Sequence, residues 1–163
     1  MKAYKILNVK EVMAHILMKD TFDEFLVSEV KILGKANLFL TGKPAEGFFP
    51  EEALDESGYV AYKELRSICF DMIKGEKTPD SFTFMFLLKR SEVENLIEDC
   101  DSTLQPQDVE SLSVLVRFKD GELSFTTGSA LRIFTMDKSL NMAWDQWLER
   151  FMDKCGILWD ALA

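Results

Sequence analysis

The chain offers few side chains for acid–base or nucleophilic catalysis, and they are scattered along the sequence. It has one histidine, His15, and three cysteines, Cys69, Cys100 and Cys155, with no CxxC pair. A reactive thiolate needs a histidine or another cation beside it, and His15 is distant in sequence from all three cysteines. We therefore expect a surface imidazole and buried, reduced thiols, although the sequence leaves open whether any cysteine is reactive.

Sequence patterns of common cofactor and metal sites are missing as well. The chain has no GxGxxG, GxxxxGK[ST] or GxSxG motif, so neither a phosphate-binding loop nor a nucleophile elbow is predicted. Asp99-Cys100-Asp101 begins like a calcium loop, but Thr103 and Leu104 stand where an acid or amide and a glycine belong. We predict no cofactor and no metal site.

Cations and aromatic side chains are the candidates for binding instead. Arg66 stands at the margin of an apolar helical stripe, where an arginine either pairs with an acid or reaches to water. An anion site shared with Arg132 and Lys138 is the functional alternative. Phe48-Phe49 and Trp159 fall outside the main apolar stripes and could anchor a partner. The speculative ligand- or partner-binding residues are therefore Arg66, Arg132, Lys138, Phe48, Phe49 and Trp159.

Two further groups allow a structural and a functional interpretation. Trp144 and Trp147 are expected in the core, with a tryptophan-lined ligand groove as the alternative. The acidic side chains of the loop between residues 42 and 58 are expected to face solvent, with docking onto a basic partner or weak divalent-cation binding as the alternative. These acidic residues are Glu46, Glu51, Glu52, Asp55 and Glu56.

The composition is that of an ordinary globular protein. Of 163 residues, 47% are hydrophobic and 29% are charged, and 19 basic against 28 acidic side chains give a formal net charge of −9. This acidic balance disfavours nucleic acid and anionic membranes as partners. The longest apolar run, residues 82–88, is too short to span a bilayer. Because no secretory signal is recognised at the start, we expect a cytoplasmic protein.

The periodicity of apolar residues predicts the elements that position these side chains. Strands are expected at residues 3–7, 25–33, 36–41, 82–88, 111–119, 123–127 and 130–135. Helices are expected after capping boxes at Asn8 and Ser91, and over residues 61–73 and 139–155. Asp120-Gly121 predicts a tight two-residue hairpin between two of the strands.

The order of the elements repeats once along the chain. Residues 1–80 and 81–163 both indicate a β-α-β-β-β-α unit, and Gly75 and Gly156, each closing a long helix, are 156 − 75 = 81 residues apart. We predict one α+β domain, residues 1–163, in which an internal duplication forms one mainly antiparallel sheet with helices on one face. This order resembles TATA-binding-protein-like and sliding-clamp-like folds, which contact DNA through basic surfaces. The net charge of −9 departs from that pattern, so their function does not carry over.

Several stretches of the chain form a recognisable set: Arg66–Phe70 with Ile73-Lys74-Gly75 and Thr78-Pro79, Thr127–Ala130, Phe134–Lys138, and the tail with Trp144, Trp147, Phe151 and Gly156. Together these stretches resemble an uncharacterised domain-of-unknown-function family of Gram-positive anaerobic bacteria. The resemblance covers most of the chain and implies a bacterial, cytoplasmic setting. It implies no activity.

The leading interpretation is a cytoplasmic binding or interaction protein without an evident catalytic site, and the sequence leaves open whether it is an enzyme. One alternative is a small-molecule enzyme or ligand-binding protein whose pocket is dispersed in sequence. Another is a saddle- or clamp-like protein associated with nucleic acid. We expect a protein or small-molecule partner and no membrane, and the sequence leaves a homodimer, the ligand and the biological process open.

Overall fold

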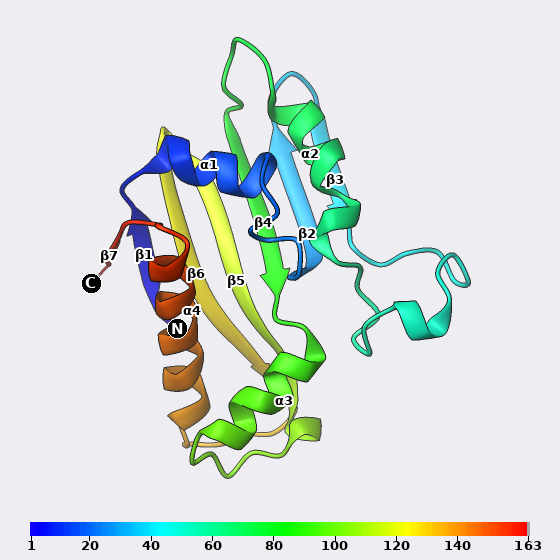
Figure 1. The fold of residues 1–163 in the computed structure, drawn as a ribbon, viewed down its shortest axis with the longest axis vertical. Helices are drawn as coiled ribbons and strands as arrows, with labels where there is room; N and C mark the ends of the chain where they lie inside the picture. Colours follow the sequence, from blue (N-terminus) through cyan, green and yellow to red (C-terminus); the bar gives the residue numbers. More distant parts are fainter. Residues whose placement is uncertain (163) are drawn as a thin grey trace.

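A computed structural model describes residues 1–162 of the chain. Within these residues, one sheet of seven strands lies behind four helices, all on the same face of the sheet (Figure 1). The strands are β1 (Ala3–Ile6), β2 (Leu26–Leu33), β3 (Asn37–Thr41), β4 (Ser81–Leu87), β5 (Val109–Lys119), β6 (Glu122–Leu131) and β7 (Trp159–Ala161). The helices are α1 (Val9–Leu17), α2 (Arg66–Ile73), α3 (Arg90–Asp99) and α4 (Ser139–Lys154). The predicted α+β class, with one antiparallel sheet and helices on one face, is confirmed.

The strands follow the order β3-β2-β4-β5-β6-β1-β7, and every neighbouring pair is antiparallel. The predicted hairpin between β5 and β6 is confirmed, because Asp120 and Gly121 both have positive φ, at 53° and 77°. The central strand β4 alternates as predicted. Phe82, Phe84 and Phe86 are fully buried toward the helices, and the residues between them face the other side.

One core joins the two halves of the chain. The same cluster of buried side chains includes residues of β1, β2, β4, β5, β6 and all four helices. Its largest fully buried members are Trp144, Tyr4, Tyr62, Phe22, Phe82, Phe84, Phe86 and Phe125. Because β4–β6 of the second half lie between β2 and β1 of the first, neither half forms a separate sheet with a core of its own.

The structure does not show the predicted internal duplication. Both halves do run strand, helix, two strands, helix, but the sheet places their first strands differently. In the second half the first strand, β4, pairs with the next strand, β5. In the first half the first strand, β1, does not lie beside β2 but pairs with β6 and β7 of the second half. A twofold rotation that exchanged the two halves would give β1 and β4 equivalent places in the sheet, and their places are not equivalent. The saddle and clamp comparisons therefore receive no support.

Some local predictions are wrong at the ends of elements. Residues 130–135 form no strand of their own, since β6 runs on to Leu131 and an irregular segment follows. Tyr62–Glu64 form a short 3-10 turn, and α2 begins only at Arg66 rather than at residue 61. Asn8 does not cap α1 with its side chain but bonds to the side chain of Glu11 at 3.0 Å. Within residues 1–162, no helix has the length and apolar character needed to cross a bilayer.

Candidate functional site

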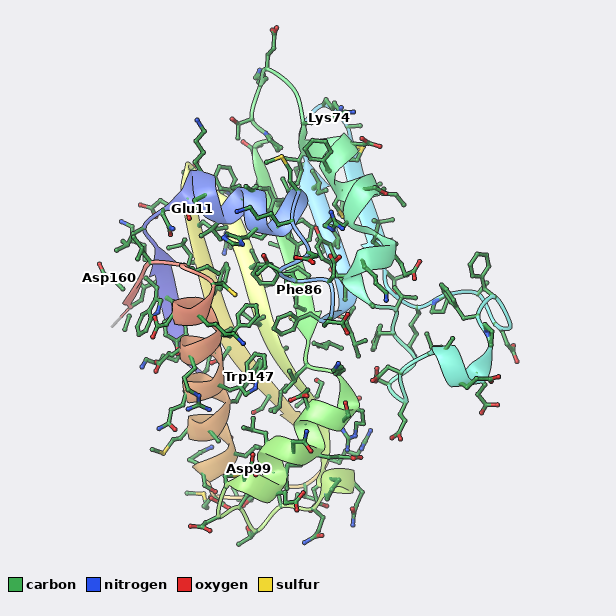
Figure 2. All side chains as sticks on the ribbon, viewed as in Figure 1. Glu11, Lys74, Phe86, Asp99, Trp147 and Asp160 are labelled. Carbon is green, nitrogen blue, oxygen red and sulfur yellow. The ribbon has the colours of Figure 1, made fainter. Side chains whose placement is uncertain are left out.

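A groove runs between α3, α4 and the connection from α1 to β2. Two adjoining hollows of about 320 Å³ each form it, and both are lined by Trp147 and Glu92. Figure 2 shows Trp147 on the side of α4 that faces α3, and Asp99 at the end of α3 nearest to α4. We call it the aromatic groove, and its lining includes Phe25, Leu88, Glu92, Asp99, Trp147, Arg150 and Phe151.

Three aromatic rings form the apolar part of the aromatic groove. Trp147 and Phe151, one turn apart on α4, stack with centroids 5.6 Å apart and planes 8° from parallel. Phe25 is perpendicular to both rings, at centroid distances of 5.9 and 5.3 Å. These are favourable arrangements for aromatic pairs. Phe25 is buried while Trp147 and Phe151 are half-buried, so the exposed parts of the latter two are available to a ligand.

Charged side chains surround these rings. Glu92 and Asp99 lie two turns apart on α3, and Arg150 faces them from α4. Within residues 1–162 none of these three forms an ion pair, whereas Lys89 and Glu24 at the other end of the groove pair at 3.5 Å. Two unpaired carboxylates against one guanidinium, beside aromatic rings, suit a cationic group better than an anionic one.

The carboxylate of Asp137 fixes the two helices at one end of the aromatic groove. The N–H and hydroxyl of Ser139, at the start of α4, donate to it at 2.9 and 2.6 Å. The N–H and hydroxyl of Thr103, which follows α3, donate to it at 2.9 and 3.2 Å. These bonds, above all that from the Ser139 hydroxyl, hold the pKa of Asp137 well below its usual range. This end of the groove is therefore preformed.

The start of α3 is held by residues far away in sequence. The backbone N–H of Arg90 donates to the carboxylate of Asp55, in the acidic loop, at 3.1 Å. The Arg90 guanidinium donates to the carbonyl oxygens of Val109, at 2.6 Å, and Pro106. No side chain from the predicted capping box at Ser91 caps this helix. Asp55 takes that role, so this one acid of the loop is structural.

Comparison with known protein families gives one match. The model of DUF5721, a family of unknown function, matches residues 15–160. The chain belongs to this family. The predicted membership of a domain-of-unknown-function family is thus confirmed, and the matched range contains every residue of the aromatic groove. No curated protein and no solved structure was found to match the chain.

The three cations of the predicted anion site are not brought together. The Arg66 guanidinium donates to both carboxylate oxygens of Asp23, at 2.8 and 3.1 Å, which is the structural pairing considered above. This hydrogen bonding raises the pKa of Arg66. Arg132 donates to the carbonyl oxygen of Gln107 at 3.0 Å. Figure 1 shows the connection from β6 to α4, which carries Arg132 and Lys138, at the opposite end of the molecule from α2.

The predicted aromatic anchors differ in exposure. Phe48 is 74% exposed, and its neighbour Phe49 packs against the core with the two rings 5.1 Å apart. Trp159 is half-buried: its ring meets that of Tyr4 at 5.1 Å, and its indole N–H donates to Asp153 at 3.0 Å. Trp159 is therefore engaged within the fold, and Phe134, at 90% exposure, is the aromatic residue that solvent reaches most.

The histidine and the cysteines do not form a catalytic group. His15 Nδ1 lies 2.6 Å from the Thr21 hydroxyl, and burial lowers the pKa of the imidazole. Cys69 is buried, and burial raises the pKa of its thiol to about 12. Burial also raises the pKa of Cys155. Among residues 1–162, no three or more His, Cys, Asp or Glu side chains are grouped so that they could hold a metal ion.

The face of the sheet opposite the helices carries mixed charge. By the register of the strand pairs, the charged side chains that point to this face are four cations and three acids, a net charge of 4 − 3 = +1. The cations are Lys5, Lys31, Arg117 and Lys119, and the acids are Glu29, Glu122 and Asp160. Two of the cations are paired within the face, Lys31 with Glu29 at 3.2 Å and Lys5 with Glu122 at 3.8 Å. This distribution gives little support to a nucleic-acid surface, which needs several free cations.

Sequence reasoning identified only part of the aromatic groove. Trp144 is buried in the core and donates its indole N–H to the Ser113 carbonyl oxygen at 2.9 Å, whereas Trp147 lines the groove, as the alternative interpretation had it. Phe25 and Glu92 were not predicted as groove residues. The sequence places Phe25 in the strand expected at residues 25–33 and Glu92 in the helix expected after Ser91, and neither element is the helix that carries Trp147. A signal was present in α3, where Glu92 and Asp99, seven residues apart, mark one polar face of the helix.

Proposed function

We propose that this protein is a binding protein, and that the aromatic groove takes an organic cation with an apolar body. The observation that carries the proposal is the stacked pair of Trp147 and Phe151 facing the unpaired carboxylates of Glu92 and Asp99. Aromatic ring faces and edges bind the apolar body, and carboxylates attract the charge. The two hollows, at about 320 Å³ each, have the volume of small-ligand sites.

The position of the charges suggests how the ligand lies. The hollow next to α3 contains both Glu92 and Asp99. The hollow next to Phe25 and Leu88 exposes mainly apolar surface, and of its charged side chains Glu24 and Lys89 are paired with each other. A ligand that spans both would place its ammonium group toward α3 and its apolar part over Phe151. Arg150 faces the α3 wall, so an anionic group in the place of the ammonium would meet two carboxylates and one guanidinium.

A titration with phenethylamine, followed by the tryptophan fluorescence, tests this proposal. We expect saturable binding, and much weaker binding of 3-phenylpropionate, which has a similar apolar body with the opposite charge. Trp147→Leu should weaken binding of phenethylamine about tenfold, because it removes the indole that lines both hollows and contributes aromatic surface to each. Glu92→Gln should weaken it about two- to fivefold, as expected for one partly exposed charge pair.

The matched control for the charge is Glu94→Gln. Glu94 lies on the same helix, two residues from Glu92, and does not line the groove. The substitution changes the net charge of the protein equally and should leave the affinity unchanged. Equal binding of the amine and the carboxylate, or equal effects of the two glutamine variants, would contradict the proposed cation selectivity.

We place this binding protein in the bacterial cytoplasm. The resemblance to a family of Gram-positive anaerobes supports that setting, and so do three free cysteines, which are typical of reducing compartments. Fractionation of cells that express the chain with its natural ends would test the location, and recovery from the membrane or the medium would contradict it.

A further inference from the structure

Within residues 1–162, the outer edge of β3 is an unpaired edge of the sheet. β3 pairs with β2 on one side, and it is the last strand of the sheet on the other. Edge strands present free backbone N–H and C=O groups that can pair with another chain. Natural edges are commonly blocked by charges or by proline within the strand. The strand from Asn37 to Thr41, with the sequence NLFLT, contains neither.

The ladder between β2 and β3 shows which groups are free. The register pairs Val30 with Leu40 and Ile32 with Leu38. At both ends of this ladder, bonds join even-numbered residues: the N–H of Gly42 donates to the Ser28 carbonyl at 2.9 Å, and that of Gly34 to the Ala36 carbonyl at 3.3 Å. Hydrogen-bonded and non-bonded pairs alternate along an antiparallel ladder. The backbone groups of the odd-numbered residues 37, 39 and 41 therefore point away from β2.

These free groups are arranged symmetrically about Phe39. A second β3 laid antiparallel on this edge would exchange bonds between Asn37 and Thr41 of the two copies, and between the two copies of Phe39. The Phe39 side chain is 64% exposed, and on a twofold axis it would meet its own copy as an aromatic cross-strand pair. The edge is thus self-complementary in its hydrogen bonds and in its central side chain.

We propose that two copies of this chain associate through β3, about a twofold axis at Phe39, and form one continuous sheet. The three residue pairs exchange two bonds each, about six in all. The strand itself places no charge against its copy. Pairing of a short edge makes a small interface, so the dimer is weak and forms in the micromolar range of concentration. This inference does not depend on the aromatic groove.

The residues flanking the strand predict how the dimer responds to salt. The same register would bring Lys35 of one copy near Lys43 of the other. Both ammonium groups are already engaged within the monomer, Lys35 with the Asp71 carbonyl oxygen at 3.0 Å and Lys43 over the Tyr59 ring at 5.5 Å. Salt screens the remaining repulsion between these cations and between two chains of net charge −9. We therefore expect association to strengthen as salt rises.

Sedimentation velocity between about 5 and 500 µM tests the proposal, a range that brackets weak, small interfaces. The natural chain should shift from monomer toward dimer across it. Phe39→Lys should raise the dimer dissociation constant at least about tenfold, because two like charges would face each other across the axis. Phe39→Pro should act similarly, because it removes an N–H that faces solvent in the monomer and leaves the ladder to β2 intact.

The matched control is Phe48→Lys, which makes the same change at another exposed phenylalanine, 74% exposed and outside the sheet. It should dimerise like the natural chain. Thermal melts by circular dichroism should show that all three variants fold. A natural chain that stays monomeric at every concentration and salt level, or a Phe39→Lys variant that dimerises as well as Phe48→Lys, would overturn the proposal.

Discussion

Replacing Phe25 by alanine tests the part of the structure where the core and the aromatic groove meet. The ring is 4% exposed and lies between 5.3 and 5.9 Å from the rings of Phe22, Phe86, Trp147 and Phe151. Truncation of such a ring costs about 3–5 kcal/mol of unfolding free energy, since the removed surface and the cavity both contribute. Four aromatic neighbours limit how far the site can collapse, so we expect a loss of about 4 kcal/mol.

Urea unfolding followed by tryptophan fluorescence measures this loss. The control is Phe48→Ala, which truncates the same side chain at a site that is 74% exposed and should change the unfolding free energy by less than about 0.5 kcal/mol. Because total stabilities are about 5–15 kcal/mol, the Phe25→Ala variant should remain largely folded but unfold at clearly lower urea. A loss below about 1 kcal/mol would mean that these rings are not closely packed, and the account of the groove would fail with them.

Three further predictions concern single contacts. Tyr62→Phe should cost about 1–3 kcal/mol in urea unfolding, because the buried hydroxyl donates to the Ile16 carbonyl oxygen at 2.9 Å, while Tyr59→Phe, at a less buried site, should cost little. The folded-state pKa of Asp137 is lowered, so its contribution to stability is present above about pH 4, the unfolded pKa, and is lost as the pH falls through the folded value. Asp137→Asn should therefore lose less stability than the natural chain between pH 4 and pH 2 in melts by circular dichroism, and a parallel decline would count against the bonds to this carboxylate. Cys69, with its pKa raised to about 12 by burial, should react with Ellman's reagent at pH 8 only after unfolding, and immediate reaction of all three thiols would contradict its burial.

Local patterns were sufficient to predict much of the sheet. The alternation of Phe82, Phe84 and Phe86 and the Asp120-Gly121 turn depend on neighbours in sequence, and both predictions are confirmed. The class and the single-sided packing of the helices follow from these patterns, because each element has one apolar face to bury.

The order of strands in the sheet could not be predicted in this way. The duplication was inferred from element order, but the place of β1 beside β6 depends on contacts far apart in sequence, among them the Lys2 N–H donating to the Thr127 hydroxyl at 2.9 Å. The start of α3 likewise depends on Asp55, which is 35 residues from Arg90. The local pattern at Ser91 predicts a capping box, and a single sequence does not indicate that a residue as distant as Asp55 caps the helix instead.

The aromatic groove shows the same limit at the level of single residues. Trp147 belongs to the apolar stripe of α4 and was expected in the core. Only the packing of α3 against α4, fixed through Asp137, leaves part of this ring open to a ligand. The charges that give the groove its character come from Glu92 and Asp99 on another helix. Their proximity to Trp147 is a property of the fold.

The indole N–H signals of the three tryptophans provide the most direct test of the aromatic groove. Trp144 and Trp159 have bonded indole N–H groups, to Ser113 and Asp153, and neither residue lines the groove. In ¹⁵N–¹H spectra of the labelled protein, phenethylamine should shift the Trp147 indole signal in a saturable way and leave the other two in place. Equal small shifts of all three signals, or none at millimolar amine, would contradict the claim that this groove is the binding site.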